Sequence, residues 1–187
     1  GTIIKSPCKK CGGAARIRSS KTLQITVPAG VEDGRRIRLT GEGEAGVRGG
    51  PRGDLYILVN IKPHSFFKRD GANLFCRVPV PMTTAALGGA VEVPTIEGTR
   101  TRIKIPPGTQ TGQQLRLKSQ GMSIMRSESR GDMYVEIFVE TPVNLDKKQV
   151  ELMKQLDDSL EKAGRKNSPE SEGFFRKVKE LWKDLNE

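Results

Sequence analysis

Alternating apolar and polar residues form the main pattern along most of the chain. Residues 22–27 alternate in this way, which predicts a strand with one buried face. Residues 36–39 repeat the alternation and predict a second strand, which a glycine-rich loop over residues 41–53 follows. Residues 55–61 are nearly all apolar, so we expect a third strand that is covered on both faces.

A second series of strands is expected further along the chain. Residues 83–87 predict a short helical turn that Gly88 ends. The turn residues Glu97 and Gly98 separate two apolar runs and indicate a β-hairpin. The strands of this part are expected at residues 74–80, 90–93, 101–105, 115–117 and 133–139.

These two series of strands are copies of one plan. Residues 25–43 match residues 103–121 at seven of nineteen positions, at a constant offset of 78 residues. The tripeptide Arg-Gly-Asp occurs at residues 52–54 and again at residues 130–132, at the same offset. An offset that holds across two separate blocks indicates a duplicated β module. Such a tandem favours an extended binding surface over a single enzyme pocket.

The pattern changes to helical spacing near the end of the chain. Leu152, Met153, Leu156 and Leu160 lie on one helical face. A serine and a proline at residues 168–169 predict the start of another helix. That helix carries a strongly apolar stripe, which consists of Phe174, Phe175, Val178, Leu181, Trp182 and Leu185. The stripe could pack on the β modules or against a second chain.

We therefore expect a mainly β protein with two tandem modules of the same fold and a short helical C-terminal segment. The expected divisions are residues 1–15, which hold a cysteine pair, residues 16–69 and 70–145 for the two β modules, and residues 146–187 for the helices. The second module has a front part over residues 71–98 that has no counterpart in the first. We expect the first module to lack that front part.

The net charge of +10 raises the possibility of a nucleic-acid partner. The excess is concentrated in residues 1–52, which carry 11 basic and 4 acidic side chains. No aromatic residue lies among those basic ones to stack on a base, which favours an ordinary solvated surface. A basic β-rich nucleic-acid-binding protein stays as the alternative function. No apolar run is long enough to cross a membrane, so we expect no membrane partner.

Cysteine usage indicates a reducing, cytoplasmic setting and half of a metal site. The chain has 3 cysteines, an odd count that argues against a disulfide framework. Cys8 and Cys11 have the spacing of a zinc knuckle, but zinc requires four ligands and the only histidine, His64, is far away in the sequence. We expect a half-site only. No nucleophile or carboxylate pairs with His64, so enzyme activity is not expected.

Several motifs together resemble the DnaJ co-chaperones of the bacterial type with a cysteine-rich domain. They include Pro-Cys-Lys-Lys-Cys-Gly-Gly at residues 7–13, Val-Pro-Ala-Gly-Val-Glu-Asp-Gly at 27–34 and Gly-Glu-Gly-Glu-Ala-Gly at 41–46. Lys-Pro-His at residues 62–64 and Ala-Ala-Leu-Gly at 85–88 match as well. The matches run in order along essentially the whole chain. The chain resembles the C-terminal part of a family member, with one of the family's four cysteine repeats and without the J domain.

The resemblance implies two β-sandwich domains that bind unfolded or misfolded polypeptides, and a helical segment that forms a homodimer. It also implies a DnaK-type ATPase chaperone as partner of the whole protein. Leu23 and Ile57 match positions of the family's client groove. The apolar stripe matches its dimerisation segment. The family's zinc ions need cysteines that this chain lacks, so we expect no zinc in this chain alone.

Overall fold

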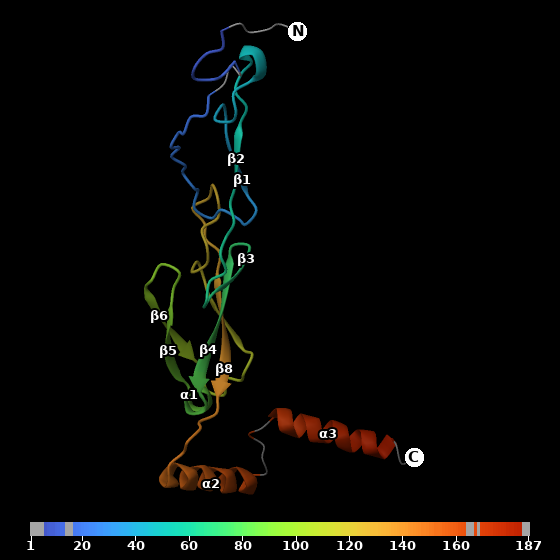
Figure 1. Ribbon diagram of the computed structural model, residues 1–187. Helices are drawn as coiled ribbons and strands as arrows, with labels where there is room; N and C mark the ends of the chain where they lie inside the picture. The colour runs from blue at the N-terminus through green and yellow to red at the C-terminus, as the bar shows by residue number, and fades with distance from the viewer. Residues whose placement is uncertain (1–5, 14–16, 164–166, 168, 185–187) are drawn as a thin grey trace. The chain divides into compact units, whose positions relative to one another are not determined.

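The computed structural model describes residues 6–13, 17–163, 167 and 169–184, and the chain divides into two units, Gly1–Glu140 and Thr141–Glu187 (Figure 1). The first unit is built mainly from strands and the second from helices. The expectation of a mainly β protein with a helical C-terminal segment is confirmed.

The second module is a four-stranded sheet with a hairpin packed on it. Strands β4 (Asn73–Pro81) and β8 (Met133–Glu140) pair in parallel at the centre of the sheet, and β3 (Lys68–Asp70) and β7 (Gln114–Leu117) pair antiparallel at its edges. The hairpin consists of β5 (Gly89–Pro94) and β6 (Arg100–Ile105). Helix α1 (Met82–Leu87) connects β4 to β5. The predicted strands and helical turn of this module are confirmed.

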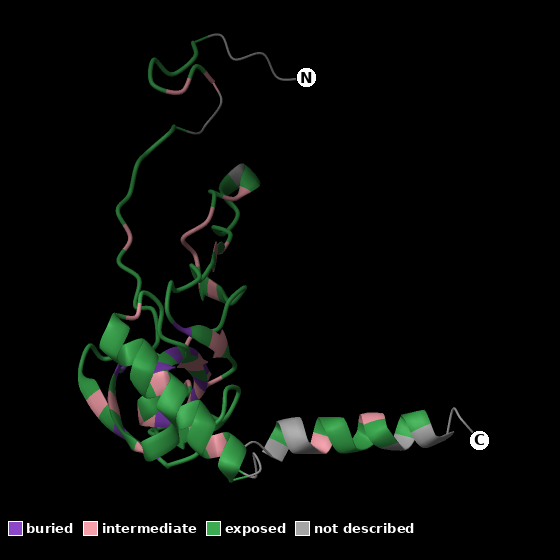
Figure 2. Ribbon diagram, turned by 90° about the horizontal axis from the view of Figure 1, so that it is seen from below, coloured by how far each residue is buried: buried purple, intermediate pink, exposed green. Residues whose placement is uncertain are grey.

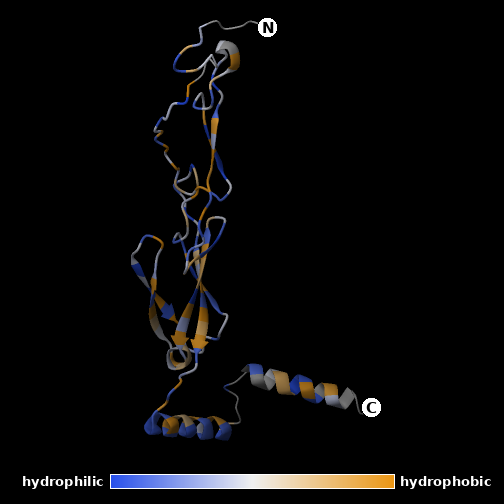
Figure 3. Cartoon of the chain, viewed as in Figure 1, coloured by the Kyte–Doolittle hydropathy of each residue, from blue (hydrophilic) through white to orange (hydrophobic). Residues whose placement is uncertain are grey.

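The hydrophobic core lies between this sheet and the hairpin. Alternate residues of β4 and β8 are buried because successive side chains of a strand point to opposite faces. Figure 3 shows the resulting concentration of hydrophobic residues on both strands. The core residues are Phe67, Leu74, Cys76, Val78, Val80, Ala85, Val93, Ile103, Ile105, Met133, Val135 and Ile137.

The first module is a smaller, more exposed structure. It contains the antiparallel pair β1 (Arg36–Leu39) and β2 (Leu55–Leu58), and a short 3-10 helix, η1 (Val47–Gly49), lies in the loop between them. The predicted strand over residues 22–27 is wrong, since these residues form no regular strand. Their repeat counterparts lie in β6, which pairs with β5, and no described segment pairs with residues 22–27 in that way.

The expected covering of the third strand on both faces is also wrong. Leu55, Tyr56 and Leu58 are 36%, 59% and 55% exposed. Figure 2 colours the described residues before Phe67 as exposed or intermediate, in contrast to the buried residues of the second module. Apolar composition identified the strand, but a cover requires a second layer of structure, which the described part of this module does not provide.

The duplication extends to individual backbone hydrogen bonds. The Gly34 amide donates to the Val59 carbonyl at 2.9 Å, and 78 residues later the Gly112 amide donates to the Ile137 carbonyl at 2.8 Å. The Ile61 amide donates to the Asp33 carboxylate at 2.6 Å, and the Val139 amide donates to the Thr111 hydroxyl at 3.0 Å. These last pairs occupy equivalent positions although aspartate and threonine differ. The two modules are therefore copies in geometry as well as in sequence.

The C-terminal unit contains two amphipathic helices, α2 (Lys147–Lys162) and α3 (Pro169–Asp184). Asp146 caps the start of α2 with a capping box. Its carboxylate accepts from the Gln149 backbone amide at 2.8 Å, and the Gln149 side-chain oxygen accepts from the Asp146 backbone amide. The predicted N-cap at residue 168 and the last stripe residue, Leu185, lie outside the described residues. Among the described residues, neither helix is long and apolar enough to cross a bilayer.

Candidate functional site

The first module presents an apolar face that has become core in the second module. Residue pairs at the repeat offset allow a direct comparison of burial. Ile103 and Ile105 are 5% and 1% exposed, whereas their counterparts Ile25 and Val27 are 38% and 57% exposed. Met133 is fully buried, whereas its counterpart Leu55 is 36% exposed. We use the name first-module apolar face for the apolar residues of β1, β2 and the irregular segment before Pro28, together with Val59; they are Leu23, Ile25, Val27, Ile37, Leu39, Leu55, Ile57 and Val59.

Both residues predicted to bind clients belong to this face. Ile57 lies in β2 opposite Ile37 of β1, and it is half-buried, whereas its counterpart Val135 is fully buried. Leu23 is half-buried in the irregular segment before Pro28. Among the described residues, no strand pairing or hydrogen bond joins Leu23 to Ile57. The structure thus places both on the same kind of surface without assembling them into one strand pair.

In each module a carboxylate clasp joins the residue before the last strand to the turn that follows the antiparallel partner of that strand. The Gly41 amide donates to Asp54 Oδ1 at 2.9 Å, and Arg38 Nε donates to Asp54 Oδ2 at 2.6 Å. In the second copy Asp132 accepts from the Ser119 amide at 2.9 Å and from Arg116 Nε at 2.7 Å. Both hydrogen bonds hold the pKa of each carboxyl below its usual value, and the bond from the backbone amide has the larger effect.

The Arg-Gly-Asp tripeptides at residues 52–54 and 130–132 lie directly before β2 and β8. The role of their aspartates as clasps was missed. The signal was present, because Arg38 and Arg116 recur at the same offset as the aspartates they bind.

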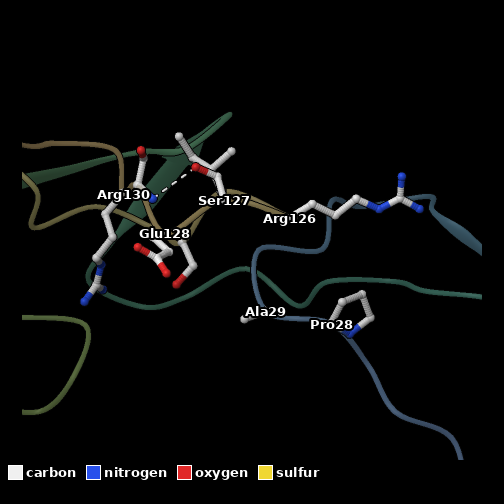
Figure 4. A pocket seen from close by; sticks show the side chains of 9 residues that line it. Pro28, Ala29, Arg126, Ser127, Glu128 and Arg130 are labelled. Atoms are coloured by element: carbon white, nitrogen blue, oxygen red, sulfur yellow. Dashed lines mark hydrogen bonds between the residues drawn. The ribbon is translucent and has the colours of Figure 1, made fainter.

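The loop after residue 27 contacts the second module within the first unit. Arg69 donates to the Val31 carbonyl at 2.8 Å and to the Gly30 carbonyl at 3.3 Å. Gly30 has a φ of +82°, and a Cβ at this position would collide with the Ser123 carbonyl. Beside it lies an open hollow of about 680 Å³, lined by Pro28, Ala29, Ser123, Ile124, Arg126, Ser127, Glu128, Ser129 and Arg130 (Figure 4).

Two polar side chains of this hollow, those of Ser127 and Arg130, have protein partners. Arg130 donates to the Gly121 carbonyl at 2.9 Å and pairs with Glu97. The Ser129 amide donates to the Ser127 hydroxyl at 3.1 Å. The hollow lies where the loop that contains Gly30 meets the loop of residues 123–130.

The cysteine pair lies in a turn with backbone amides around the Cys8 sulfur. The backbone amides of Lys10 and Cys11 donate to the Cys8 sulfur and hold the pKa of its thiol below the usual value, and the Cys11 side chain adds to the effect. The Gly12 amide donates to the Cys8 carbonyl at 2.8 Å and closes the turn. Among the described residues, no group of three or more histidine, cysteine or acidic side chains could hold a metal ion.

His64 has a structural role in a tight turn. Its Nδ1 accepts from the Phe66 and Phe67 amides at 3.1 and 3.2 Å, and its ring lies 5.3 Å from that of Phe67. These bonds fix the chain where it enters the core of the second module through Phe67.

The predicted dimerisation stripe lies along α3 with most of its apolar area exposed. Phe174, Phe175, Leu181 and Trp182 are 62%, 63%, 59% and 67% exposed, and Val178 is partly buried. The rings of Phe174 and Phe175 meet edge to face at 5.5 Å.

Comparison with known proteins identifies the family. Residues 5–142 match the model of the DnaJ C terminal domain, and residues 148–184 match that of the Chaperone protein DnaJ C-terminal region. The chain belongs to the DnaJ family.

Individual relatives agree with the family match. Over the whole chain it is 63% identical to the Chaperone protein DnaJ of Paramagnetospirillum magneticum and 65% identical to that of Rhodospirillum centenum. It is 54% identical to the Chaperone protein DnaJ of Brucella canis. The chain covers 49%, 48% and 49% of these proteins, so it spans about half their length. The resemblance derived from the motifs is confirmed, and nothing in the comparisons supports the nucleic-acid alternative.

Proposed function

We propose that this chain is the client-binding and dimerising part of a DnaJ-type co-chaperone of the cytoplasm. It binds unfolded or misfolded polypeptides, and the whole protein delivers them to a DnaK-type ATPase chaperone. The family match over residues 5–142 and 148–184 supports this role, as do relatives that are named chaperones. The free thiols of Cys8, Cys11 and Cys76 suit a reducing compartment.

The first-module apolar face carries this proposal. Unfolded polypeptides differ from folded ones in exposing apolar side chains, so a receptor for them needs exposed apolar area of its own. Ile25, Val27 and Leu55 provide such area at positions where the second module has closed its core. Clients bind there through Leu23 and Ile57, which lie half-buried within the face.

Two substitutions on β2 test the site. Ile57→Ser removes an apolar side chain from the face, whereas Leu58→Ser changes the next residue, whose side chain points to the opposite side of the strand. Covering the rest of Ile57 with an apolar client is worth about 1.4 kcal/mol, so Ile57→Ser should weaken binding of an apolar peptide about tenfold. Leu58→Ser should bind as the parent chain does.

Fluorescence anisotropy of a labelled peptide measures both affinities, and circular dichroism checks that each variant is folded. Leu23→Ala should reduce affinity in the same direction. Equal affinities of the parent chain and a folded Leu23→Ala, Ile57→Ser double variant would place client binding elsewhere.

The stripe on α3 supports homodimerisation. Four of its large side chains are more than half exposed, and an isolated helix of 16 residues is marginal in water without a partner surface. Replacing Phe174 and Phe175 with serine should convert the dimer to a monomer in light scattering at tens of micromolar. As a control, Arg176→Ser alters the side of the helix opposite the stripe and should leave the dimer intact. A monomeric parent chain at these concentrations would refute this assembly.

Zinc belongs to the cysteine-rich domain of the whole protein in this proposal. Cys8 and Cys11 supply two thiolates of a tetrahedral site, and the lowered pKa of Cys8 favours the thiolate form that zinc binds. The remaining two ligands must come from other cysteines. The chain by itself should hold no zinc tightly.

A further inference from the structure

Arg69 of the second module binds backbone carbonyls of both modules with one side chain. Its Nε donates to the Gly71 carbonyl at 2.8 Å, in the turn that follows its own strand, β3. The other two guanidinium nitrogens donate to the first module, to the Val31 carbonyl at 2.8 Å and the Gly30 carbonyl at 3.3 Å. A guanidinium is planar and its donors have fixed directions, so the bond to Gly71 orients the group for the other two bonds.

The same loop of the first module also contacts the second module through the backbone of Gly30. Gly30 has a φ of +82°, and a Cβ at this position would overlap the Ser123 carbonyl oxygen and lie 2.9 Å from the Met125 amide nitrogen. The backbone of the loop therefore lies directly against the backbone of residues 123–125. A side chain at position 30 would force the two loops apart.

The repeat shows that these contacts are additional to those that build the turn. Gly108, the counterpart of Gly30, has nearly the same φ of +79°, but no described atom lies within 4 Å of its Cβ position. The amides of Gly108 and Thr109 donate to carbonyls of α1 at 3.1 and 3.0 Å. The contacts of Gly30 with the other module use its carbonyl and its Cα instead.

One sequence difference leaves the Gly30 carbonyl to Arg69. In the second module the Gln110 side-chain amide donates to the Gly108 carbonyl at 3.2 Å. The residue at the equivalent position of the first module is Glu32, and a carboxylate accepts hydrogen bonds but donates none. The donor for the Gly30 carbonyl is therefore Arg69, which belongs to the other module.

This loop directly follows the irregular segment that carries Leu23, Ile25 and Val27, three residues of the first-module apolar face. The chain also joins the modules covalently through residues 60–67. A connection at one point permits rotation. A second contact, between Arg69 and a residue 38 positions earlier in the sequence, restricts it.

We propose that Arg69 is a positioning residue for client binding. Together with the close approach of Gly30, it holds the end of the client-binding segment on the second module and fixes the direction of the first-module apolar face relative to that module. This rests on the proposed client-binding function and gives a role to a residue outside the face. A segment that is already held binds a client more tightly, because less conformational freedom is lost on binding.

Two glycine substitutions with a similar backbone cost test the close approach. Gly30→Ala and Gly108→Ala each place a Cβ on a left-handed residue, so they strain the backbone alike, but only Gly30→Ala also forces two loops apart. Residual dipolar couplings of the full chain measure the result, since two modules in a fixed relation share one alignment tensor. The parent chain and Gly108→Ala should fit one tensor over residues 35–59 and 73–140, and Gly30→Ala should require two.

A second pair of variants tests the arginine. Arg69→Met removes the three hydrogen bonds and keeps an unbranched side chain. Lys68→Met removes a positive charge from the preceding residue, whose side chain points to the opposite face of β3. Arg69→Met should require two tensors and Lys68→Met only one. Hydrogen exchange of the β4 and β8 amides checks that the second module is folded in each variant.

Fluorescence anisotropy with a labelled apolar peptide connects this orientation to client binding. Gly30→Ala and Arg69→Met should bind the peptide about threefold to tenfold more weakly, which is the cost of ordering about one more side chain on binding. Gly108→Ala and Lys68→Met should bind as the parent chain does.

The outcomes separate this proposal from the function on which it rests. One shared tensor in both Gly30→Ala and Arg69→Met, or two tensors in Gly108→Ala as well, would overturn the role of these contacts in fixing the modules. Two tensors with unchanged peptide affinity would overturn the positioning role and leave the apolar face as the client site. A parent chain that binds no apolar peptide would refute the client-binding function itself, and the positioning role with it.

Discussion

Two isoleucines at equivalent positions of the repeat provide a sharp test of the uncovered face. Ile25 and Ile103 are separated by the repeat offset, and they are 38% and 5% exposed. Replacing each with alanine removes the same atoms from the same position of the two modules. Any difference in stability therefore reports the covering of the residue, since its chemistry and repeat position are matched.

The expected magnitudes differ severalfold. Ile103 belongs to the core cluster with Ile105 and Val135, so its truncation loses apolar burial and leaves a cavity. Such a change costs about 2–5 kcal/mol in a closed core. Ile25 is already more than a third exposed, so its truncation encloses no cavity. We expect Ile25→Ala to cost about 1 kcal/mol or less.

Hydrogen exchange of individual amides at increasing urea concentrations measures the two modules separately. Ile103→Ala should lower the opening free energy of the β8 amides, whereas Ile25→Ala should leave β8 unchanged and affect β1 and β2 only slightly. Ile25→Ala should also weaken binding of an apolar peptide. A loss of several kcal/mol at Ile25 would mean that this side chain is buried in solution, and the first-module apolar face would then be unavailable to clients.

Three further predictions concern titratable groups and metal. Folding lowers the pKa values of Asp54 and Asp132 from 3.8, so these carboxylates stabilise the fold above about pH 4 and lose that effect as the pH falls through the lower folded values. In this acid range the urea midpoint of Asp132→Asn should depend less on pH than that of the parent chain. Burial raises the pKa of Cys76 to about 11, whereas hydrogen bonds lower the pKa of Cys8. Iodoacetamide at pH 8 should therefore modify Cys8 rapidly and Cys76 only after unfolding, which mass spectrometry of digests would detect. Mild chelation should remove zinc from the chain, and one zinc retained per monomer in atomic absorption would contradict the half-site.

The sequence predicted the strands of the second module and the helices because their signals are local. Alternation over residues 74–80 and 133–139 and the glycine after residue 87 lie within single elements. The fixed offset predicted a duplication, and the equivalent hydrogen bonds of Val59 and Ile137 confirm it. Leu23 and Ile57 were identified through resemblance to a family, since strand alternation by itself equally favours a core position.

The errors in the first module have a common physical origin. Residues 22–27 alternate as well as residues 101–105 do, but a strand needs a neighbour to accept its backbone hydrogen bonds. β6 finds that neighbour in β5, and no described segment serves residues 22–27 in the same way. Likewise, apolar residues 55–61 do not reveal how many layers cover them. Pairing and covering depend on distant parts of the chain, which local patterns do not report.

Comparison of the two modules also shows which features depend on local hydrogen bonds and which depend on a closed core. The β1–β2 pair keeps the hydrogen bonds of β7–β8, and Asp54 keeps the clasp geometry of Asp132, although Leu55 is exposed where Met133 is buried. The aspartate clasp and the strand pairing therefore recur in both modules, whether or not the core beside the ribbon is closed. In the first module Leu55 is 36% exposed and Ile57 is half-buried, with no polypeptide bound. That property is what a receptor for unfolded chains requires, because the surface that binds a client must stay accessible before the client arrives.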